Sequence, residues 1–216
     1  YRETDPLGGH DPYSASKAAT ELVAASYRKS FFHADAAPLL ATARAGNVIG
    51  GGDWAADRLV PDVVRAVQSG QPARIRHPEA TRPWQHVLEP LAGYLVLGQR
   101  LLEGDARVAD AWNFGPGADG NVTVGAMLDG LRRHWPQLAW QVEPDGTRHE
   151  AQLLQLDIAK ARAGLQWHPV WTLAQTQAAT ARWYAAWLEH GQVLSQQQLQ
   201  AYVDDANAAG LPWARP

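Results

Sequence analysis

Two features of the sequence predict an α/β protein with a mostly parallel sheet. Segments with the apolar spacing of helices alternate with short apolar runs along the chain, which is the pattern of strand–helix–strand units. The chain has 216 residues, of which 46% are hydrophobic and 19% charged. This is enough to bury the core of one large domain or of two small ones.

The first helix is expected to follow a turn-forming loop. The run 7–9, Leu-Gly-Gly, is a turn signal, Asp11 can cap a helix, and Pro12 suits the first helical turn. The helix is expected to extend to about Phe32. Its buried stripe is predicted to contain Ala18, Leu22, Val23, Ser26 and Tyr27.

The later elements follow from the same periodicities. Residues 37–50 are expected to form a strand that runs into a glycine-rich turn. Further helices are expected at 57–69, 87–103, 123–134, 157–164, 172–190 and 195–208. Short strands are expected at 73–77, 111–115, 139–143 and 153–157.

Residues 115–120 read Gly-Pro-Gly-Ala-Asp-Gly and match the G-x-G-x-x-G spacing of a dinucleotide-binding turn. That motif needs its third glycine in the first turn of the following helix. Here the helix is expected to begin with Thr123 as its N-cap, and Pro116 restricts the turn. We therefore interpret the segment as a loop.

Composition excludes several classes of function. The net charge of −3 gives no general attraction to nucleic acid or to anionic membranes. No apolar run reaches the roughly 18 residues that a membrane-spanning helix needs, and the polar N-terminus does not resemble a signal peptide. The absence of cysteine excludes disulfides and is typical of a cytoplasmic protein. The eight histidines have no metal-ligand spacing, so no metal is expected.

Tyr13 and Lys17 lie four residues apart, which places both on one face of the first helix. A free phenol, with a pKa of about 10, is a poor base at neutral pH. A neighbouring ammonium stabilises the phenolate, which can make tyrosine a general acid and base. The spacing also occurs by accident in many helices, although the small residues around this pair would allow a flat ligand to approach.

Residues 74–87 concentrate basic and aromatic side chains: Arg74, Arg76, Arg82, Trp84 and His86. Arginine suits phosphate oxygens, so a diphosphate could bind here, but a solvated strand with a basic face is the alternative. Arg58 and Arg65 carry the same ambiguity. Most of the ten tryptophans are expected in the core.

Four separated stretches match one family. They read DPYSASKAATEL, ARAGNVIGGGDWAADRLVPDVVRA, RPWQHVLEPLAGYL and WNFGP. Together they resemble the extended short-chain dehydrogenase/reductase family, and within it most closely the CDP-glucose 4,6-dehydratases, which use NAD. Tyr-x-x-x-Lys alone indicates only the wider superfamily, whereas NVIGGGDW with RPWQHV is much more specific. The resemblance covers the chain from Tyr1 to about residue 190.

The resemblance implies a cytoplasmic lyase of deoxysugar biosynthesis, of the kind that serves O-antigen and lipopolysaccharide assembly. It converts CDP-glucose to CDP-4-keto-6-deoxyglucose. Tyr13 would match the base that takes the proton of the sugar 4-hydroxyl while a hydride passes to NAD. Lys17 would match the lysine that binds the nicotinamide ribose and activates the tyrosine. Both residues would thus be catalytic and cofactor-binding.

The resemblance also implies substrate-binding residues. Asn47 matches an asparagine that contacts the nucleotide diphosphate-sugar, and Arg82 matches an arginine on the diphosphate. Arg58 would assist Arg82 on the diphosphate, with Leu59 beside it as a further substrate-binding residue, and Asn113 matches a position where relatives place a polar residue near the nucleotide. His149 and Glu150 lie in a stretch that resembles a nucleotide-contacting loop.

Members of the family begin with a glycine-rich βαβ unit that holds the NAD pyrophosphate, and with a Thr-Ser-Asp-Lys-like strand end; neither occurs here. The chain is therefore expected to have an incomplete Rossmann-like fold and to be the C-terminal portion of a longer protein. That longer protein is expected to form a homodimer or homotetramer. Residues 1–50 and 86–118 would belong to the NAD-binding domain, and residues 51–85 and 119–216 to the smaller nucleotide-sugar-binding domain.

The alternatives are another nucleotide-sugar epimerase or dehydratase, and a non-catalytic remnant that binds nucleotide sugar. The isolated chain, with an open sheet edge, is expected to be aggregation-prone or partly folded.

Overall fold

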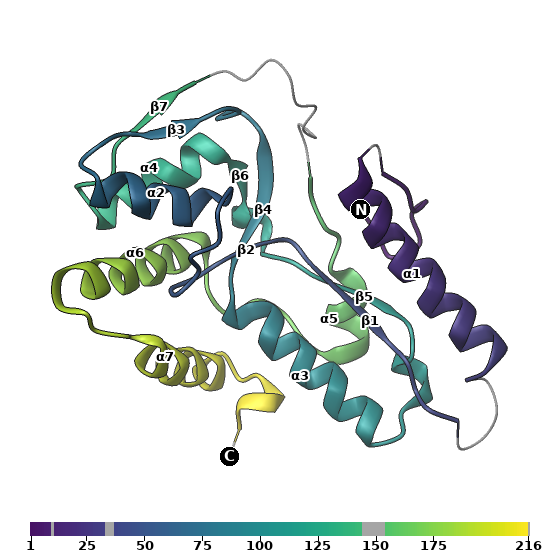
Figure 1. The fold of residues 1–216 in the computed structure, drawn as a ribbon. Coiled ribbons are helices and arrows are strands. Elements are labelled where there is room, and N and C mark those ends of the chain that lie inside the picture. The colour runs from purple at the N-terminus through teal and green to yellow at the C-terminus, as the bar shows by residue number, and fades with distance from the viewer. Residues whose placement is uncertain (10, 33–36, 144–153, 216) are drawn as a thin grey trace. The chain divides into compact units, whose positions relative to one another are not determined.

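A computed structural model describes residues 1–9, 11–32, 37–143 and 154–215. Helices and strands alternate along the chain, as Figure 1 shows, which confirms the predicted α/β class. The chain divides into two compact units. Unit 1 contains Tyr1–Ala45, Pro90–Phe114 and Leu156–His168, and unit 2 contains Gly46–Glu89, Gly115–Gln155 and Pro169–Pro216.

The division differs in detail from the expected one. Residues 156–168 pack in unit 1, because their helix contributes to the core of that unit. The assignment of NAD to one unit and of the nucleotide sugar to the other stays a prediction.

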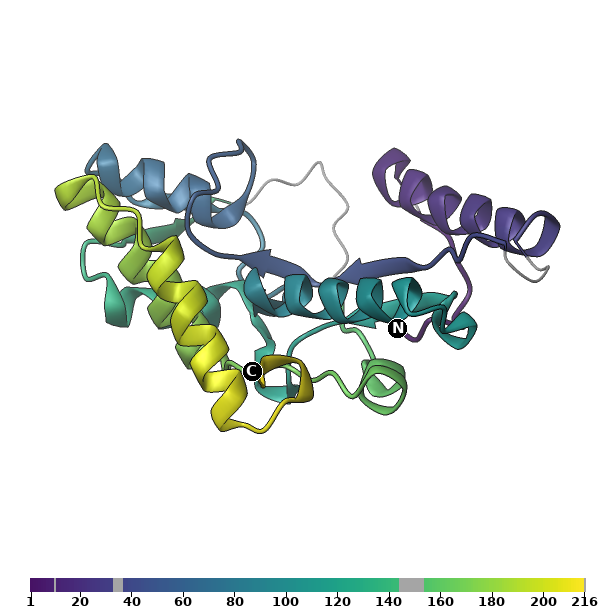
Figure 2. The same cartoon turned by 90° about the horizontal axis from the view of Figure 1, so that it is seen from below.

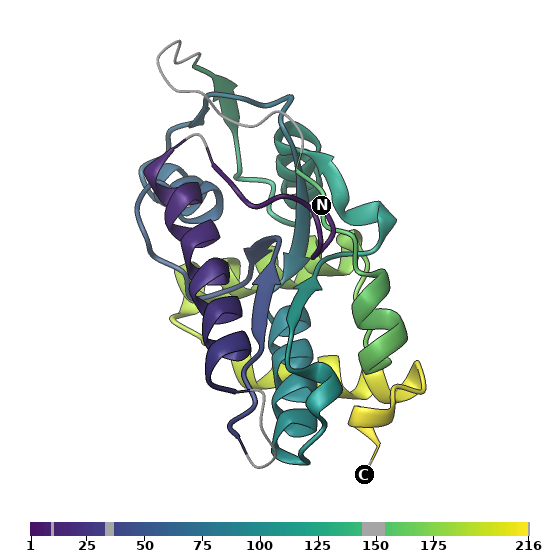
Figure 3. The same cartoon turned by 90° about the vertical axis from the view of Figure 1, so that its right-hand side faces the viewer.

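Unit 1 is built around a pair of parallel strands. β1 (Thr42–Ala45) pairs with β5 (Ala111–Phe114), with Thr42 opposite Ala111. One face of the pair is covered by α1 (Pro12–Ser30) and the other by α3 (Leu88–Leu102) and α5 (Ala159–Leu165), as Figure 2 shows. In Figure 3, α1 runs along β1 with β5 on its far side.

α1 begins as predicted. Asp11 is its N-cap and accepts hydrogen bonds from the backbone N–H groups of Tyr13 and Ser14, and Pro12 occupies the first turn. A carboxylate at this position satisfies N–H groups that have no partner inside the helix.

The predicted buried stripe of α1 is wrong. The helix turns Glu21, Ala24 and Arg28 toward the strands, and Ala24 is its one fully buried residue among those described. Leu22 is 60% exposed and Tyr27 is 49% exposed; Val23 is exposed as well, Ser26 is exposed, and Ala18 is partly covered. Polar side chains occupy this face because Glu21 pairs with Arg44 and Arg28 pairs with Asp110.

The core of unit 1 lies on the opposite face of the strands, between them and α3 and α5. Its buried members are Leu97, Val108, Trp112, Phe114, Ile158, Ala161, Leu165 and Trp167. Gly93 of α3 allows the Phe114 ring to approach, since a Cβ there would lie 2.3 Å from that ring.

The described residues of unit 2 form two small sheets and four α-helices. β2 (Asn47–Ile49) pairs in parallel with β4 (Thr81–His86), which pairs antiparallel with β6 (Asn121–Thr123). β3 (Ala73–Ile75) pairs in parallel with β7 (Trp140–Val142). The helices are α2 (Leu59–Gln68), α4 (Val124–His134), α6 (Leu173–His190) and α7 (Ser195–Ala208).

Apolar side chains of α2, α4, α6 and the strands form the core of unit 2, with Val63, Leu128, Trp135 and Trp183 among its buried members. Trp84 is also buried, and its ring N–H donates to the Val122 carbonyl. The expected placement of tryptophans in the core is thus confirmed for Trp112, Trp135, Trp167 and Trp183, whereas Trp187, also expected there, is 38% exposed.

α7 is held in unit 2 by a buried carboxylate. Glu89, 1% exposed, accepts hydrogen bonds from the backbone N–H groups of Val170 and Trp171 and from the Tyr202 hydroxyl of α7. The Trp171 ring packs edge-on against Tyr202 and against His86.

Some strands differ from the sequence prediction. Residues 154–157 form no strand, and residues 37–41 precede β1 without joining it. β4 and β6 were not predicted, because Pro83 and the polar residues of β4 break the expected alternation. Residues 118–120 form a short 3-10 helix, and Thr123 caps α4, as expected for a loop there.

Candidate functional site

The structure places Tyr13 and Lys17 together in the first turns of α1. The Lys17 Nζ atom lies 5.4 Å from the centre of the Tyr13 ring, within the range of a cation–π contact. Tyr13 is 72% exposed, and Lys17 is exposed beside it. The phenol and the ammonium are therefore adjacent and open to a ligand.

A polar joint fixes α1 to β1. The Glu21 carboxylate accepts a 2.8 Å hydrogen bond from the Thr42 hydroxyl and a 2.9 Å hydrogen bond from the Arg44 guanidinium. Burial by itself would raise the pKa of Glu21, but the two hydrogen bonds outweigh it and the pKa is lowered. Glu21 is therefore a charged partner that holds the helix on which the Tyr–Lys pair lies.

Asn113 lies in β5 with its side chain fully buried. Its amide nitrogen donates to the carbonyls of Tyr1 and Asp157, and its backbone N–H donates to the Glu3 carboxylate. The side chain thus joins three segments of unit 1. Nucleotide contact by Asn113 stays a prediction, and its observed bonds are internal to the protein.

Asn47 and Arg82 come from neighbouring strands of unit 2. The register pairs Asn47 of β2 with Trp84 of β4, and residues two apart on a strand share a face. Asn47 and Arg82 therefore lie on the same face of the sheet. Arg82 is 7% exposed, and its guanidinium donates a 2.8 Å hydrogen bond to the Thr81 carbonyl.

Arg58 and Leu59 lie where α2 begins. Arg58 is the N-cap residue, makes no side-chain cap, and is exposed, whereas Leu59 packs partly against the core. Asp57, just before them, has a positive φ of 59°, which is uncommon for a residue with a side chain. The uncapped N–H groups of a helix start favour an anion such as a phosphate.

The other candidate arginines have protein partners. Arg65 of α2 donates to the carbonyls of Trp54 and Ala55 and pairs with Asp62. Arg74 of β3 pairs with Glu143, and both side chains are largely solvent-exposed. For these two arginines the structure favours the structural alternative over phosphate binding. His149 and Glu150 lie outside the described residues.

A family model described as "NAD dependent epimerase/dehydratase family" matches residues 1–115. This segment covers more than half of the chain and includes Tyr13, Lys17, Asn47 and Arg82. The chain belongs to the NAD-dependent epimerase/dehydratase family.

A curated relative within this epimerase/dehydratase family is CDP-glucose 4,6-dehydratase of Salmonella typhimurium. It is 44% identical over 210 residues, which cover 94% of this chain and 58% of the relative. A dTDP-glucose 4,6-dehydratase of Xanthomonas campestris is 26% identical and matched over 52% of its length. The chain thus spans a little over half the length of the curated relatives that it matches.

Solved structures confirm the fold of the epimerase/dehydratase family. dTDP-glucose 4,6-dehydratase of Bacillus anthracis in complex with NAD superimposes with a TM-score of 0.72 at 22% identity, over 86% of this chain and 55% of that one. UDP-glucuronic acid 4-epimerase of Bacillus cereus gives 0.68 at 18% identity, over 84% and 54%. The incomplete Rossmann-like fold is therefore confirmed.

The described residues of this epimerase/dehydratase fit one part of NAD. Tyr13 and Lys17 offer a phenol and an ammonium, which suit the hydroxyls of a ribose. Residues 115–120 do not offer a pyrophosphate cradle, because no helix begins at the third glycine: β6 follows Gly120, and α4 starts only at Val124. In the described ranges, histidine and acidic residues form no cluster able to hold a metal ion.

Sequence reasoning missed Asp53, a partner of Arg58, and Tyr184, a partner of Asp53. Asp53 lies 3.5 Å from the Arg58 guanidinium, and the Tyr184 hydroxyl is bonded to the Asp53 backbone. Asp53 is inside the GGGDW motif, whose glycine run is a signal for close approach of the backbone to a neighbour. Tyr184 is 131 residues away along the chain, so no local pattern could indicate it.

Proposed function

We propose that the protein to which this chain belongs dehydrates CDP-glucose to CDP-4-keto-6-deoxyglucose with NAD as its cofactor. The observation that carries the proposal is the adjacent, solvent-open pair of Tyr13 and Lys17 on α1. The 44% identity to the Salmonella CDP-glucose 4,6-dehydratase supports the same reaction.

Tyr13 is proposed as the acid and base of the reaction. Its phenolate would take the proton of the sugar 4-hydroxyl, and the Lys17 ammonium would stabilise that phenolate and hold the ribose hydroxyls. Bound NAD would supply the hydride chemistry, accepting a hydride from sugar C4 and returning it at C6. The 4-keto group acidifies the C5 proton, so that this proton and the C6 hydroxyl can leave as water; the C5–C6 double bond left behind would then take the hydride at C6 and a proton at C5.

The residues of unit 2 are proposed to hold the nucleotide diphosphate. Arg82 carries a charge next to Asn47 on one face of the sheet, and the start of α2 adds Arg58 and the N–H of Leu59. Guanidinium groups and free helix N–H groups are both good partners of phosphate oxygens. Asn113 is kept as a proposed nucleotide neighbour.

Two alternatives have their own support. The fold, which is similar to that of a UDP-glucuronic acid 4-epimerase at 18% identity, hosts several reactions, so another nucleotide-sugar epimerase or dehydratase is the second candidate. Residues 115–120 offer no pyrophosphate cradle, which favours a chain that binds nucleotide sugar without catalysis by itself. We accordingly propose that the 216 residues alone are inactive.

The test is a turnover assay on the full gene product that contains this sequence. CDP-glucose should give a 4-keto product, detected by its chromophore in base, whereas dTDP-glucose and UDP-glucose should not. Tyr13→Phe and Lys17→Met should lower kcat by at least about 100-fold. The matched controls on the same helix, Tyr27→Phe and Lys29→Met, should retain activity; turnover of a UDP- or GDP-sugar instead would overturn the proposal.

Three further proposals come with this function. The absence of cysteine supports a cytoplasmic location, and the CDP-glucose reaction suits a supply of deoxysugars for O-antigen. The exposed apolar side chains of α1 support a homodimer or homotetramer of the whole protein. In the described part of the chain, no helix has the length and apolarity needed to span a bilayer.

A further inference from the structure

We propose that Tyr184 is a positioning residue for nucleotide binding: its hydroxyl fixes Asp53, and Asp53 orients the Arg58 guanidinium for a nucleoside diphosphate. The proposal rests on the proposed function, because it assumes that Arg58 is part of the diphosphate site. It assigns a role to a residue of α6, which the sequence motifs do not reach.

The Tyr184 hydroxyl makes two hydrogen bonds with one residue. It donates to the Asp53 carbonyl at 2.8 Å and accepts from the Asp53 backbone N–H at 3.1 Å. Both polar groups of that backbone unit are thus satisfied by one side chain. Burial raises the pKa of Tyr184 to about 12, so the hydroxyl remains a donor at neutral pH.

Asp53 carries this restraint to Arg58. One of its carboxylate oxygens accepts from the Ala55 N–H at 3.0 Å, and the other lies 3.5 Å from the Arg58 guanidinium. The Arg58 side chain is two-thirds exposed, so it would sample many rotamers without a partner. An arginine that is already oriented loses less conformational entropy when a phosphate binds.

The backbone of this loop is held in an unusual conformation. Asp57, directly before Arg58, has a φ of 59°, and Gly52 has a φ of 85°. Such a conformation persists where surrounding contacts determine it, and it often marks a functional segment. In this loop, residues on both sides of Asp53 make contacts that restrain the backbone.

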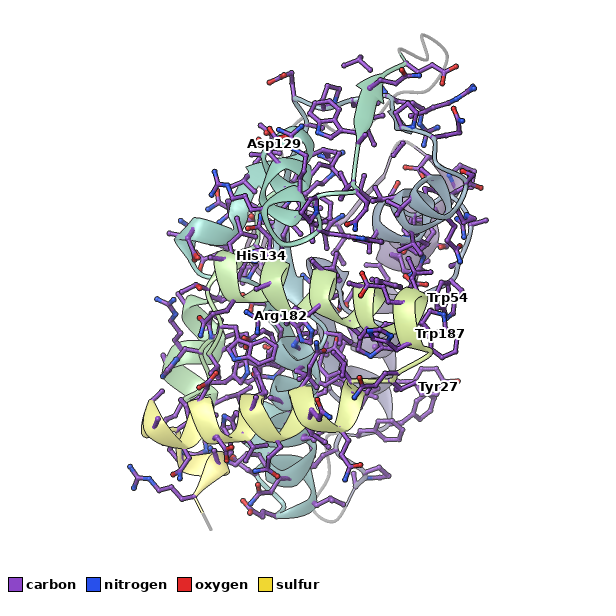
Figure 4. All side chains as sticks on the ribbon, turned by 90° about the vertical axis from the view of Figure 1, so that its left-hand side faces the viewer. Tyr27, Trp54, Asp129, His134, Arg182 and Trp187 are labelled. Atoms are coloured by element: carbon purple, nitrogen blue, oxygen red, sulfur yellow. The ribbon has the colours of Figure 1, made fainter. Side chains whose placement is uncertain are left out.

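The loop makes a steric contact just before Asp53 and polar contacts just after it. A Cβ on Gly51 would lie 2.0 Å from the Trp183 ring, so the glycine run is pressed against α6. Arg65 of α2 binds the carbonyls of Trp54 and Ala55. The ring of Trp54 also packs against Tyr184 and Trp187, and Figure 4 shows Trp54 beside Trp187. The loop is therefore fixed at its ends, and Tyr184 fixes the residue that touches Arg58.

The test measures the dissociation constant for CDP by titration calorimetry on the full gene product that contains this sequence. Tyr184→Phe keeps the ring and removes only the hydroxyl, and it should weaken CDP binding about fivefold. Arg58→Ala should weaken binding about tenfold. In the Arg58→Ala background, Tyr184→Phe should have no further effect, because its influence passes through Arg58.

Asp53→Asn provides a second variant that does not disturb a buried site. It keeps the backbone bonds to Tyr184, removes the carboxylate charge, and should weaken CDP binding to the same degree as Tyr184→Phe. The matched control is Tyr202→Phe, which removes another buried hydroxyl of unit 2, one that donates to Glu89. It should lower the melting temperature without changing the CDP dissociation constant.

The outcomes separate the two proposals. If the wild-type protein binds no CDP, the proposed function fails, and the role of Tyr184 fails with it. If the wild type binds CDP but Tyr184→Phe and Asp53→Asn bind equally well or more tightly, only the role of Tyr184 is overturned. Additive effects of Tyr184→Phe and Arg58→Ala would also overturn it, since they would indicate independent actions.

Discussion

The Tyr202 hydroxyl donates a 2.8 Å hydrogen bond to the Glu89 carboxylate, which two backbone N–H groups also contact. The carboxylate is almost fully buried. Burial raises the pKa of Glu89, although the hydrogen bonds from Trp171, Val170 and Tyr202 oppose that effect. A single acid thus connects the start of α3 to α7, and its charge state affects stability.

Glu89 gives a first prediction about pH. Because its folded pKa lies above the ordinary value of 4.5, ionisation favours the unfolded chain, and its contribution to stability is lost as pH rises from about 4.5 through the folded pKa. Glu89→Gln should remove this loss. Urea unfolding of both proteins between pH 4.5 and pH 8 measures it, with the exposed Glu79→Gln as control. A constant stability difference across that range would contradict the prediction.

His86 should make stability depend on pH in the opposite sense to Glu89, because its contribution is lost as pH falls. Burial lowers the pKa of His86 from 6.5 to about 4. The histidine is therefore neutral when folded, and its contribution to stability is lost as pH falls from about 6.5 toward 4. The loss should reach about 3 kcal/mol at most.

His86→Asn should remove that acid dependence, because asparagine keeps an acceptor near the Leu88 N–H but does not titrate. The exposed His190→Gln should leave it unchanged. The free energy of unfolding at pH 4.5 and pH 7 is the measurement, and an equal pH slope in wild type and His86→Asn would refute the assignment.

Gly51 should not tolerate a side chain. Gly51→Ala would place its Cβ 2.0 Å from the Trp183 ring, so either the loop or the buried indole must shift. We expect a loss of about 2–4 kcal/mol together with weaker CDP binding. Gly98→Ala, in α3 with open space around the new Cβ, should stabilise the helix by up to about 1 kcal/mol. Thermal melts of the two variants make the comparison.

The isolated chain should associate through α1. Leu22, Val23 and Tyr27 of this helix and Phe31 at its C-cap are largely exposed, and exposed apolar side chains of this kind favour association. Leu22→Glu should therefore raise the monomer fraction in sedimentation experiments. Leu199→Glu changes an exposed leucine of α7 and should have little effect. A sharply cooperative, monomeric wild-type protein would contradict this prediction.

Local sequence signals predicted the elements that local physics determines. Asp11 and Thr123 are N-caps in the structure, as their positions before apolar runs indicated. The resemblance of separated motifs predicted the family and the fold, which the comparisons confirm. The roles of the individual site residues stay predictions.

Contacts between distant segments could not be predicted. α1 has an apolar stripe that periodicity assigns to the core, but Glu21 and Arg28 face the strands because their partners, Arg44 and Asp110, are fixed by tertiary structure. β4 has no alternating pattern, since Pro83 and buried polar residues occupy it. The bond from Tyr184 to Asp53 depends on how α6 packs, which the local sequence does not specify.

The way α1 is attached has a consequence for experimental conditions. The helix that carries Tyr13 and Lys17 buries little apolar surface on its strand side and is held by the Glu21–Arg44 and Arg28–Asp110 pairs. Partly exposed charge pairs weaken as ionic strength rises, whereas apolar contacts do not. High salt should therefore loosen this helix before it affects the tryptophan-rich core of unit 2. Buffers chosen to prevent aggregation could in this way also reduce the order of the Tyr–Lys pair.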